Sequence, residues 1–139
     1  MNRYLLDTNA CIAMTKRNAG VWGRIREVGM ESLYLCAPVK AELWFGACKS
    51  LRVAENQARL RLFFNDLPSV PFEDAAAECC GEIRAALALA RQGQPIGPYD
   101  LQIAAIALAR GFTVVTNNTS EFIRIPGLAF DITSRCAQL

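Results

Sequence analysis

Hydrophobic residues follow two alternating patterns along the chain. Short apolar runs rich in β-branched or aromatic residues predict strands at 3–6 (RYLL), 32–37 (SLYLCA) and 112–115 (FTVV), with weaker candidates at 67–72 and 128–132. Between them, apolar residues recur at helical spacing, which predicts helices at about 8–15, 19–29, 38–50, 53–66, 73–92 and 98–110. Gly111 directly follows the last of these segments, where a helix-stopping glycine is expected.

This alternation predicts the fold class. Strands separated by helices imply right-handed crossovers and a parallel sheet, and a run such as YLL leaves no polar position for a solvent-facing side. We therefore expect an α/β/α sandwich with a central, mostly parallel sheet. The length of 139 residues, the 53% hydrophobic content and the lack of repeats or linkers favour a single domain over 1–139. Ligands of such sheets bind beyond the carboxyl ends of the strands.

Composition narrows the chemistry. Fifteen Lys and Arg nearly balance thirteen Asp and Glu, so the net charge of the whole chain is too small to indicate a polyanionic partner. No membrane-length apolar run or secretory signal is visible, so a cytoplasmic protein is expected. The six cysteines have no CxxC spacing and are expected to be small buried thiols rather than disulfide partners. Histidine is absent, which removes the commonest general base and the usual ligand of catalytic zinc.

Two acidic residues lie in apolar surroundings in the first third of the chain. Asp7 ends the first predicted strand, and a helix N-cap is the alternative role for it. Thr8 and Asn9 begin the next helix and are expected to support the site or contact the substrate. Glu42, in PVKAELWFGA, lies on the apolar stripe of its predicted helix. An unpaired buried carboxylate is costly, so Glu42 is expected to be protonated, bound to a metal or paired with an arginine.

Two further acidic residues lie near and beyond residue 100. Asp100, in GPYDLQIAA, shares a predicted helix face with core residues, although a carboxylate in the first turn also favours the helix dipole. Thr116 and Asn118 follow the strand at 112–115, and Glu121 lies three residues beyond Asn118. Asn118 and Glu121 form a variant capping box, or Thr116, Asn118 and Glu121 line the same strand-end crevice as the other acids, with Thr116 and Asn118 as supporting residues.

Several carboxylates in one crevice repel one another, and a hard divalent cation with oxygen ligands relieves that repulsion. Without histidine, Mg²⁺ or Mn²⁺ is the best candidate. Such an ion activates water and neutralises charge on a phosphate, which suits phosphodiester hydrolysis. Lys40, Arg17 and the arginines of RLRLFF are candidates for contacting RNA phosphates. The alternative is that they are ordinary solvated surface residues.

The blocks LLDTN, KAELWFGA, GPYDLQIAAIA and VVTNNTSEF together resemble, in order and spacing, the four motif blocks of the PIN-domain ribonucleases, especially the VapC-type toxins of toxin–antitoxin pairs. The resemblance covers nearly the whole chain. It implies that Asp7, Glu42 and Asp100 are the metal-binding acids. The family usually has a further acid in the T-x-D/N segment, where this chain has Asn118 with Glu121 next, so either residue is a candidate to complete the site.

The resemblance also implies partners. A cognate antitoxin would dock a C-terminal segment over the groove of the toxin, and the toxin would form a homodimer and larger toxin–antitoxin assemblies. Structured cellular RNA, often transfer RNA, is the implied substrate. Trp44, Phe45, Phe63 and Phe64 are candidates for the docking groove, with core packing as the alternative for most of them.

Two other functions compete with the nuclease. A receiver-like signalling domain needs a lysine after a late strand, and none follows FTVV. A PIN-like module that binds RNA or protein without cleavage is kept open by Asn118 at the fourth acidic position.

Overall fold

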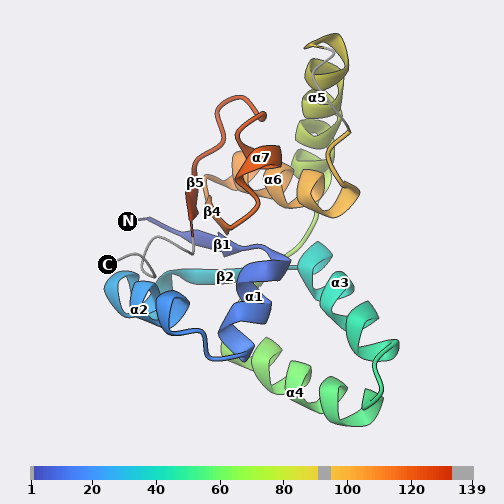
Figure 1. The fold of residues 1–139 in the computed structure, drawn as a ribbon. Coiled ribbons are helices and arrows are strands. Elements are labelled where there is room, and N and C mark those ends of the chain that lie inside the picture. Colours follow the sequence, from blue (N-terminus) through green and yellow to red (C-terminus); the bar gives the residue numbers. More distant parts are fainter. Residues whose placement is uncertain (1, 91–94, 133–139) are drawn as a thin grey trace.

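The structure, a computed structural model, describes residues 2–90 and 95–132. Its centre is a five-stranded, all-parallel sheet in the order β3-β2-β1-β4-β5 (Figure 1). In the register, Leu5 lies opposite Tyr34 on one side and Val114 on the other. The strands are β1 (Tyr4–Leu6), β2 (Leu33–Cys36), β3 (Ser69–Val70), β4 (Thr113–Thr116) and β5 (Phe130–Ile132).

Helices cover both faces of this sheet, with α5 and α6 on one side and α1 and α4 on the other (Figure 1). The predicted α/β/α fold with a parallel sheet is therefore confirmed. A short α7 and a 3-10 turn at Met30–Ser32 were not predicted, and positions 91 and 92 of the fifth predicted helix lie outside the described residues. The helices are α1 (Thr8–Thr15), α2 (Ala19–Val28), α3 (Ala37–Cys48), α4 (Val53–Asp66), α5 (Asp74–Ala90), α6 (Pro98–Arg110) and α7 (Thr119–Phe122).

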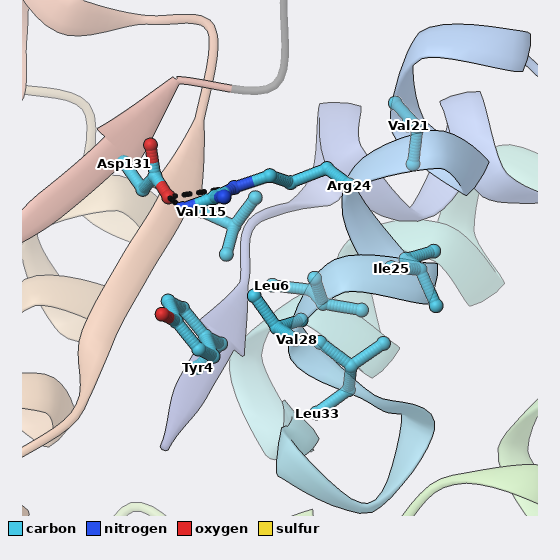
Figure 2. A pocket seen from close by; sticks show the side chains of 9 residues that line it. All are labelled: Tyr4, Leu6, Val21, Arg24, Ile25, Val28, Leu33, Val115 and Asp131. Atoms are coloured by element: carbon cyan, nitrogen blue, oxygen red, sulfur yellow. Dashed lines mark hydrogen bonds and ion pairs between the residues drawn. The ribbon is translucent and has the colours of Figure 1, made fainter. Parts of the chain in front are cut away.

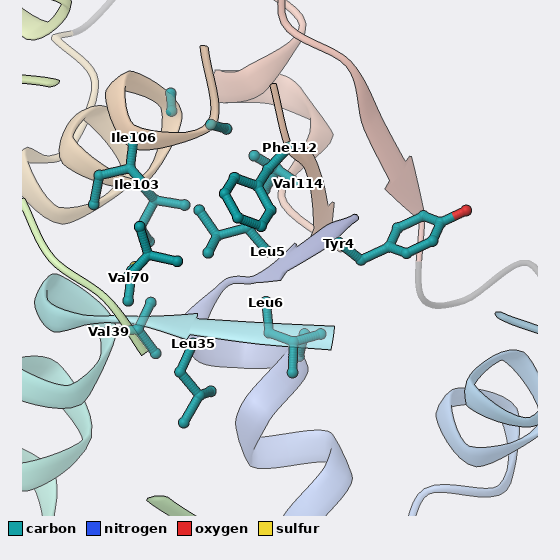
Figure 3. Packing of buried hydrophobic residues seen from close by; sticks show 14 of the residues in the cluster. Tyr4, Leu5, Leu6, Leu35, Val39, Val70, Ile103, Ile106, Phe112 and Val114 are labelled. Atoms are coloured by element: carbon teal, nitrogen blue, oxygen red, sulfur yellow. The ribbon is translucent and has the colours of Figure 1, made fainter. Parts of the chain in front are cut away.

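The core lies on both sides of β1. Successive strand residues point to opposite faces, so Leu5 points toward Phe112 and α6 while Leu6 points the other way (Figure 3). Both leucines are buried, as the all-apolar run predicted. Ile103 to Ala107 are buried in succession, which makes α6 the most deeply embedded helix in the described part of the chain.

Gly111 ends α6 as predicted. Its φ of +74° lies in the left-handed region, and its N–H donates to the carbonyl of Ala107. A glycine adopts this conformation without the steric cost that a Cβ imposes. The sharp stop turns the chain directly into β4, which places the residues after β4 beside the start of α6.

The cysteines are free thiols within the described residues, as expected, but the expectation that they are buried is wrong for one of them. Cys11 and Cys36 are buried, Cys79 and Cys80 are half-buried, and Cys48 is exposed at the end of α3, while Cys136 lies outside the described residues. Cys48 lies on the face of α3 that also carries the exposed residues Ala41 and Phe45, so its thiol reaches solvent. Among the described helices, none has the length and apolar character required to cross a membrane.

Candidate active site

Asp7 lies at the carboxyl end of the central strand and is almost completely buried, with 2% of its surface exposed. Its backbone N–H donates to the Val115 carbonyl at 3.1 Å, which continues the sheet. Its Oδ1 accepts a 2.8 Å hydrogen bond from the N–H of Ala10 and so caps α1. The capping role is therefore real, but one hydrogen bond does not offset the burial of a whole carboxylate.

The electrostatic environment of Asp7 opposes ionisation. Burial raises its pKa, hydrogen bonds with Thr116 and Ala10 act against this rise, and the negative charge of Glu42 adds to it. Within residues 2–90 and 95–132, no lysine or arginine forms an ion pair with Asp7. A buried acid without a cationic partner is a site that a bound cation would stabilise.

Glu42 reaches the same region from α3, which begins beside β2 with Pro38 in its first turn. The carboxylate is half-buried, and its Oε2 accepts a 2.5 Å hydrogen bond from the Thr8 hydroxyl of α1. The alternative of an arginine ion pair is not seen, because no ion pair of the described residues includes Glu42. Glu42 points toward the start of α1 rather than into the core.

Asp100 and Glu121 are joined by the side-chain amide of Asn118. This Nδ2 group donates to Asp100 Oδ2 at 3.0 Å and to Glu121 Oε2 at 3.1 Å. Asn118 precedes α7 but makes no side-chain capping bond to it, so the alternative of a capping box is wrong. The reason is that the amide has two half-buried carboxylates within reach, and hydrogen bonds to charged groups are the stronger ones.

The two carboxyl groups also interact with each other. Burial, together with the hydrogen bond and negative charge of Glu121, raises the pKa of Asp100 to about 7, and the charge of Asp7 contributes. Conversely, the hydrogen bond from Asp100 lowers the pKa of Glu121. Of this pair, Asp100 is thus the group that takes up a proton first as the pH falls toward 7, while Glu121 stays ionised.

The predicted supporting residues have distinct positions. Thr116 is fully buried and connects the two halves of the site: it hydrogen-bonds Asp7, and its Oγ1 accepts from the backbone N–H of Asn118 at 2.8 Å. Thr8 holds Glu42. Asn9 is exposed on the first turn of α1.

The acids are gathered less tightly than ligands of one ion. Among the described residues, no three Asp, Glu or Cys side chains form a group close enough to hold a metal. Glu42 lies on one side with Thr8, and Asp100 and Glu121 lie on another with Asn118. Asp7 interacts electrostatically with Glu42 and with Asp100. Like charges and local hydrogen bonds keep these groups apart, while their chemistry, oxygen donors without histidine, fits a hard divalent cation.

A groove lies beside the acids, and Phe45, one of the four aromatic residues expected in a docking groove, lines it. It has a volume of about 650 Å³ and is lined by α1, α3 and α4, including Thr8 and Glu42. Phe45, Lys49 and Arg59 line it as well. The sequence signal for the groove was present, because Phe45 and Lys49 lie three and seven residues after Glu42 and so share its helix face.

The other predicted basic and aromatic residues lie outside this groove's lining. Lys40 Nζ lies 5.0 Å from the ring centre of Phe64, and the Arg61 guanidinium lies 5.3 Å from that of Trp44. Trp44, Phe63 and Phe64 are half-buried. Phe63 and Phe64 pack against the hydrophobic core, so the packing alternative holds for these two, whereas Trp44 is not among the described residues packed against the core.

A second cavity lies under α2, away from the acids. It is lined mainly by apolar side chains such as Val21, Ile25 and Leu33, and an ion pair between Arg24 and Asp131 of 2.7 Å lies at its edge (Figure 2). Its volume is about 20 Å³. A space of this size holds about one water molecule, so it is no substrate site.

The fold and the site together define a class of protein, an α/β/α protein with carboxylates gathered at the carboxyl ends of its parallel strands. The sequence matches the PIN domain over residues 4–128, and the chain therefore belongs to the PIN-domain family.

Named relatives cover nearly the whole chain. It is 40% identical over 134 residues to the tRNA(fMet)-specific endonuclease VapC of Salmonella typhimurium, covering 94% of this chain and 98% of the relative. It is 38% identical over 128 residues to the protein of the same name from Shigella flexneri, with 92% and 96% covered. It is 35% identical over 130 residues to Ribonuclease VapC2 of Rickettsia felis, also with 92% and 96% covered.

Solved structures agree with these relatives. A DNA-bound VapBC complex from Salmonella typhimurium contains a chain that is 37% identical, with a TM-score of 0.86 and with 96% of this chain and 99% of that chain covered. VapBC2 of Rickettsia felis, bound to a DNA fragment from its promoter, contains a chain that is 34% identical, with a TM-score of 0.83 and 93% and 97% covered.

Proposed function

We propose that the protein is a metal-dependent endoribonuclease that acts as the toxin of a toxin–antitoxin pair and hydrolyses phosphodiester bonds in structured RNA. The observation that carries this proposal is the burial of the Asp7 carboxylate at the end of the central strand, beside other acids and without a described cationic partner. The names of the relatives as VapC endonucleases and ribonucleases support it.

Asp7, Glu42 and Asp100 are the proposed ligands of Mg²⁺ or Mn²⁺, with Glu121 as the fourth acid of the site. When bound, such an ion lowers the pKa of a coordinated water and neutralises charge that develops on a phosphate. Thr8 orients Glu42, and Thr116 orients Asp7. Asn118 keeps the carboxylates of Asp100 and Glu121 at a fixed separation, so in this proposal it is a positioning residue rather than a ligand.

The partners are proposed from the relatives. Two solved relatives are VapBC complexes bound to DNA, so we expect a cognate antitoxin and an assembly that includes a toxin homodimer. Two curated relatives are named as specific for tRNA(fMet), which makes initiator transfer RNA the first substrate to test. Action on cellular RNA implies a cytoplasmic location, and we propose that residues 1–139 act as a single domain.

The test is cleavage of labelled transfer RNA by the full chain with Mg²⁺ or Mn²⁺ and with EDTA. We expect EDTA to abolish cleavage, and Asp7→Asn or Asp100→Asn to lower its rate by about 100-fold or more, since each removes a charge that a divalent ion requires. Asp66→Asn, an exposed acid at the end of α4, is the matched control and should cleave normally.

Two results would count against the proposal. Cleavage that survives both Asp7→Asn and Asp100→Asn would show that these acids do not perform the hydrolysis. RNA binding without any cleavage, in protein that is folded and metal-loaded, would instead favour the non-cleaving PIN-like binding module.

A further inference from the structure

The groove beside Glu42 combines one acidic residue with several cations. Lys16, Lys49 and Arg59 line it, whereas Glu42 is its single acidic lining residue among those described. Glu55 binds Arg59 at 2.9 Å on the exposed surface of α4, and no described ion pair includes Lys16 or Lys49. The charge of the groove away from Glu42 is therefore positive and suits an anionic occupant.

Phe45 is the feature that distinguishes this groove from a plain basic surface. Its side chain is 60% exposed, although it lies in a helix with well-buried apolar neighbours such as Leu43. The Lys49 ammonium lies 4.8 Å from the centre of its ring. An exposed aromatic ring beside a cation is the combination on which an unpaired nucleobase stacks while its phosphate is neutralised.

The order of these residues along α3 links the groove to the acids. Glu42, Phe45, Gly46 and Lys49 recur at three- to four-residue spacing and form one stripe on the helix. Lys49, the C-cap of α3, follows Glu42 by seven positions, a rise of about 10 Å along the helix axis. Neighbouring nucleotides of one strand can therefore reach both the acids and Lys49.

The groove has open space at Gly46. A Cβ added to Gly46 would meet no atom within 4 Å. Glycine is the least favourable helix residue apart from proline, and here no close backbone contact requires it. The lack of a side chain at this position leaves open space in the lining of the groove.

We infer that this groove is a nucleotide subsite of the proposed ribonuclease: an unpaired base next to the cleaved bond stacks on Phe45, and the adjoining phosphate contacts Lys49. This inference rests on the proposed function and identifies a part of the substrate that the protein contacts away from the acidic residues of the active site. It also predicts a preference for single-stranded loops, since a paired base has no free face for stacking.

The test measures RNA binding in the Asp7→Asn background with EDTA, so that cleavage does not interfere. The probe is a fluorescently labelled RNA hairpin with a single-stranded loop, and the readout is its dissociation constant at several salt concentrations. Phe45→Ala should weaken binding by about tenfold, and Phe45→Tyr should restore it. Lys49→Ala should also weaken binding and should reduce the salt dependence by about 0.7 in log–log slope, as the loss of one single-strand phosphate contact does.

Matched controls separate the groove from general surface effects. Phe72→Ala and Arg84→Ala remove an exposed ring and an exposed cation that do not line the groove, and both should bind the hairpin normally. Gly46→Leu should block the groove and weaken binding. Gly81→Leu places the same side chain at an equally open helical glycine of α5 and should have no effect.

Either of two results would overturn the inference: binding by Phe45→Ala, Lys49→Ala and Gly46→Leu as tight as by the controls, or no hairpin binding at all by the Asp7→Asn protein. If these three substitutions weaken only the association with a partner protein and leave RNA binding unchanged, the groove is a protein-docking surface and the inference also fails. Failure of the proposed function would give a different result. The wild-type chain would then cleave no RNA, although hairpin binding would still depend on Phe45.

Discussion

The side-chain amide of Asn118 donates to Asp100 at 3.0 Å and, from the same nitrogen, to Glu121 at 3.1 Å. One neutral group thus holds two acids that come from different elements of the fold. Its Oδ1 atom in turn accepts from the Ser120 hydroxyl at 3.0 Å, which orients the amide so that its nitrogen faces the acids.

Asn118→Ala should therefore lower both stability and activity, although Asn118 is only half-buried. Without the amide, the carboxyl groups of Asp100 and Glu121 lose a shared donor, and hydrogen bonds to charged groups contribute roughly 1.5–3 kcal/mol when buried, less when half-exposed. We expect the free energy of unfolding in urea to fall by about 1 kcal/mol and the cleavage rate to fall in parallel. Asn65→Ala, on the exposed surface of α4, should change neither quantity.

Thr8→Val tests the orientation of Glu42. The substitution keeps the side-chain shape but removes the hydroxyl that donates to Glu42 at 2.5 Å. We expect a loss of cleavage of about tenfold, as for other residues that orient metal ligands, with only a small change in thermal stability. Thr8→Ser, which keeps the donor, should retain most of the rate. Equal rates for Thr8→Val and the wild type would show that this hydrogen bond has no part in the reaction.

The cysteines should differ sharply in reactivity. Burial raises the pKa of Cys11 well above its usual value and that of Cys36 to about 12, whereas Cys48 is exposed. Because the thiolate is the reactive form, its fraction at Cys36 stays very small until the pH approaches 12. Alkylation of the native protein at pH 8, followed by peptide mapping, should label Cys48 and spare Cys11 and Cys36. Labelling of all three at similar rates would contradict their burial.

Two glycines should respond to alanine with opposite signs. Gly81 lies inside α5 with open space around its missing Cβ, so Gly81→Ala should stabilise the protein by about 0.8–1 kcal/mol through helix propensity. Gly111 has a φ of +74°, where alanine costs about 1–2 kcal/mol. Thermal unfolding should show a midpoint raised by about 3 °C for the first variant and lowered for the second. A lower midpoint for Gly81→Ala would indicate that its surroundings are not open.

Local physical chemistry accounts for what could be predicted about the fold. The apolar run before Asp7 predicted a buried strand, and helical spacing with Gly111 at its end predicted α6 within a residue. The weak runs at 67–72 and 128–132 contain the short strands β3 and β5. Backbone pairing with the neighbouring strands β2 and β4 stabilises these segments, which are too short to be strong strand predictions. The burial of Cys48 was predicted wrongly, because spacing does not tell which side of a helix meets solvent.

Local spacing and side-chain chemistry thus determined where the strands and helices lie and which acids are candidates for the site, because those depend on neighbours along the chain. Whether the acids bind a metal stays a prediction. Only the tertiary structure decided that Thr116 joins Asp7 to Asn118, that Asn118 turns toward Asp100 instead of capping α7, and that α4 closes a groove beside Glu42. These contacts depend on the strand order and on competition among hydrogen-bond partners distant in sequence, and neither is encoded in any local pattern.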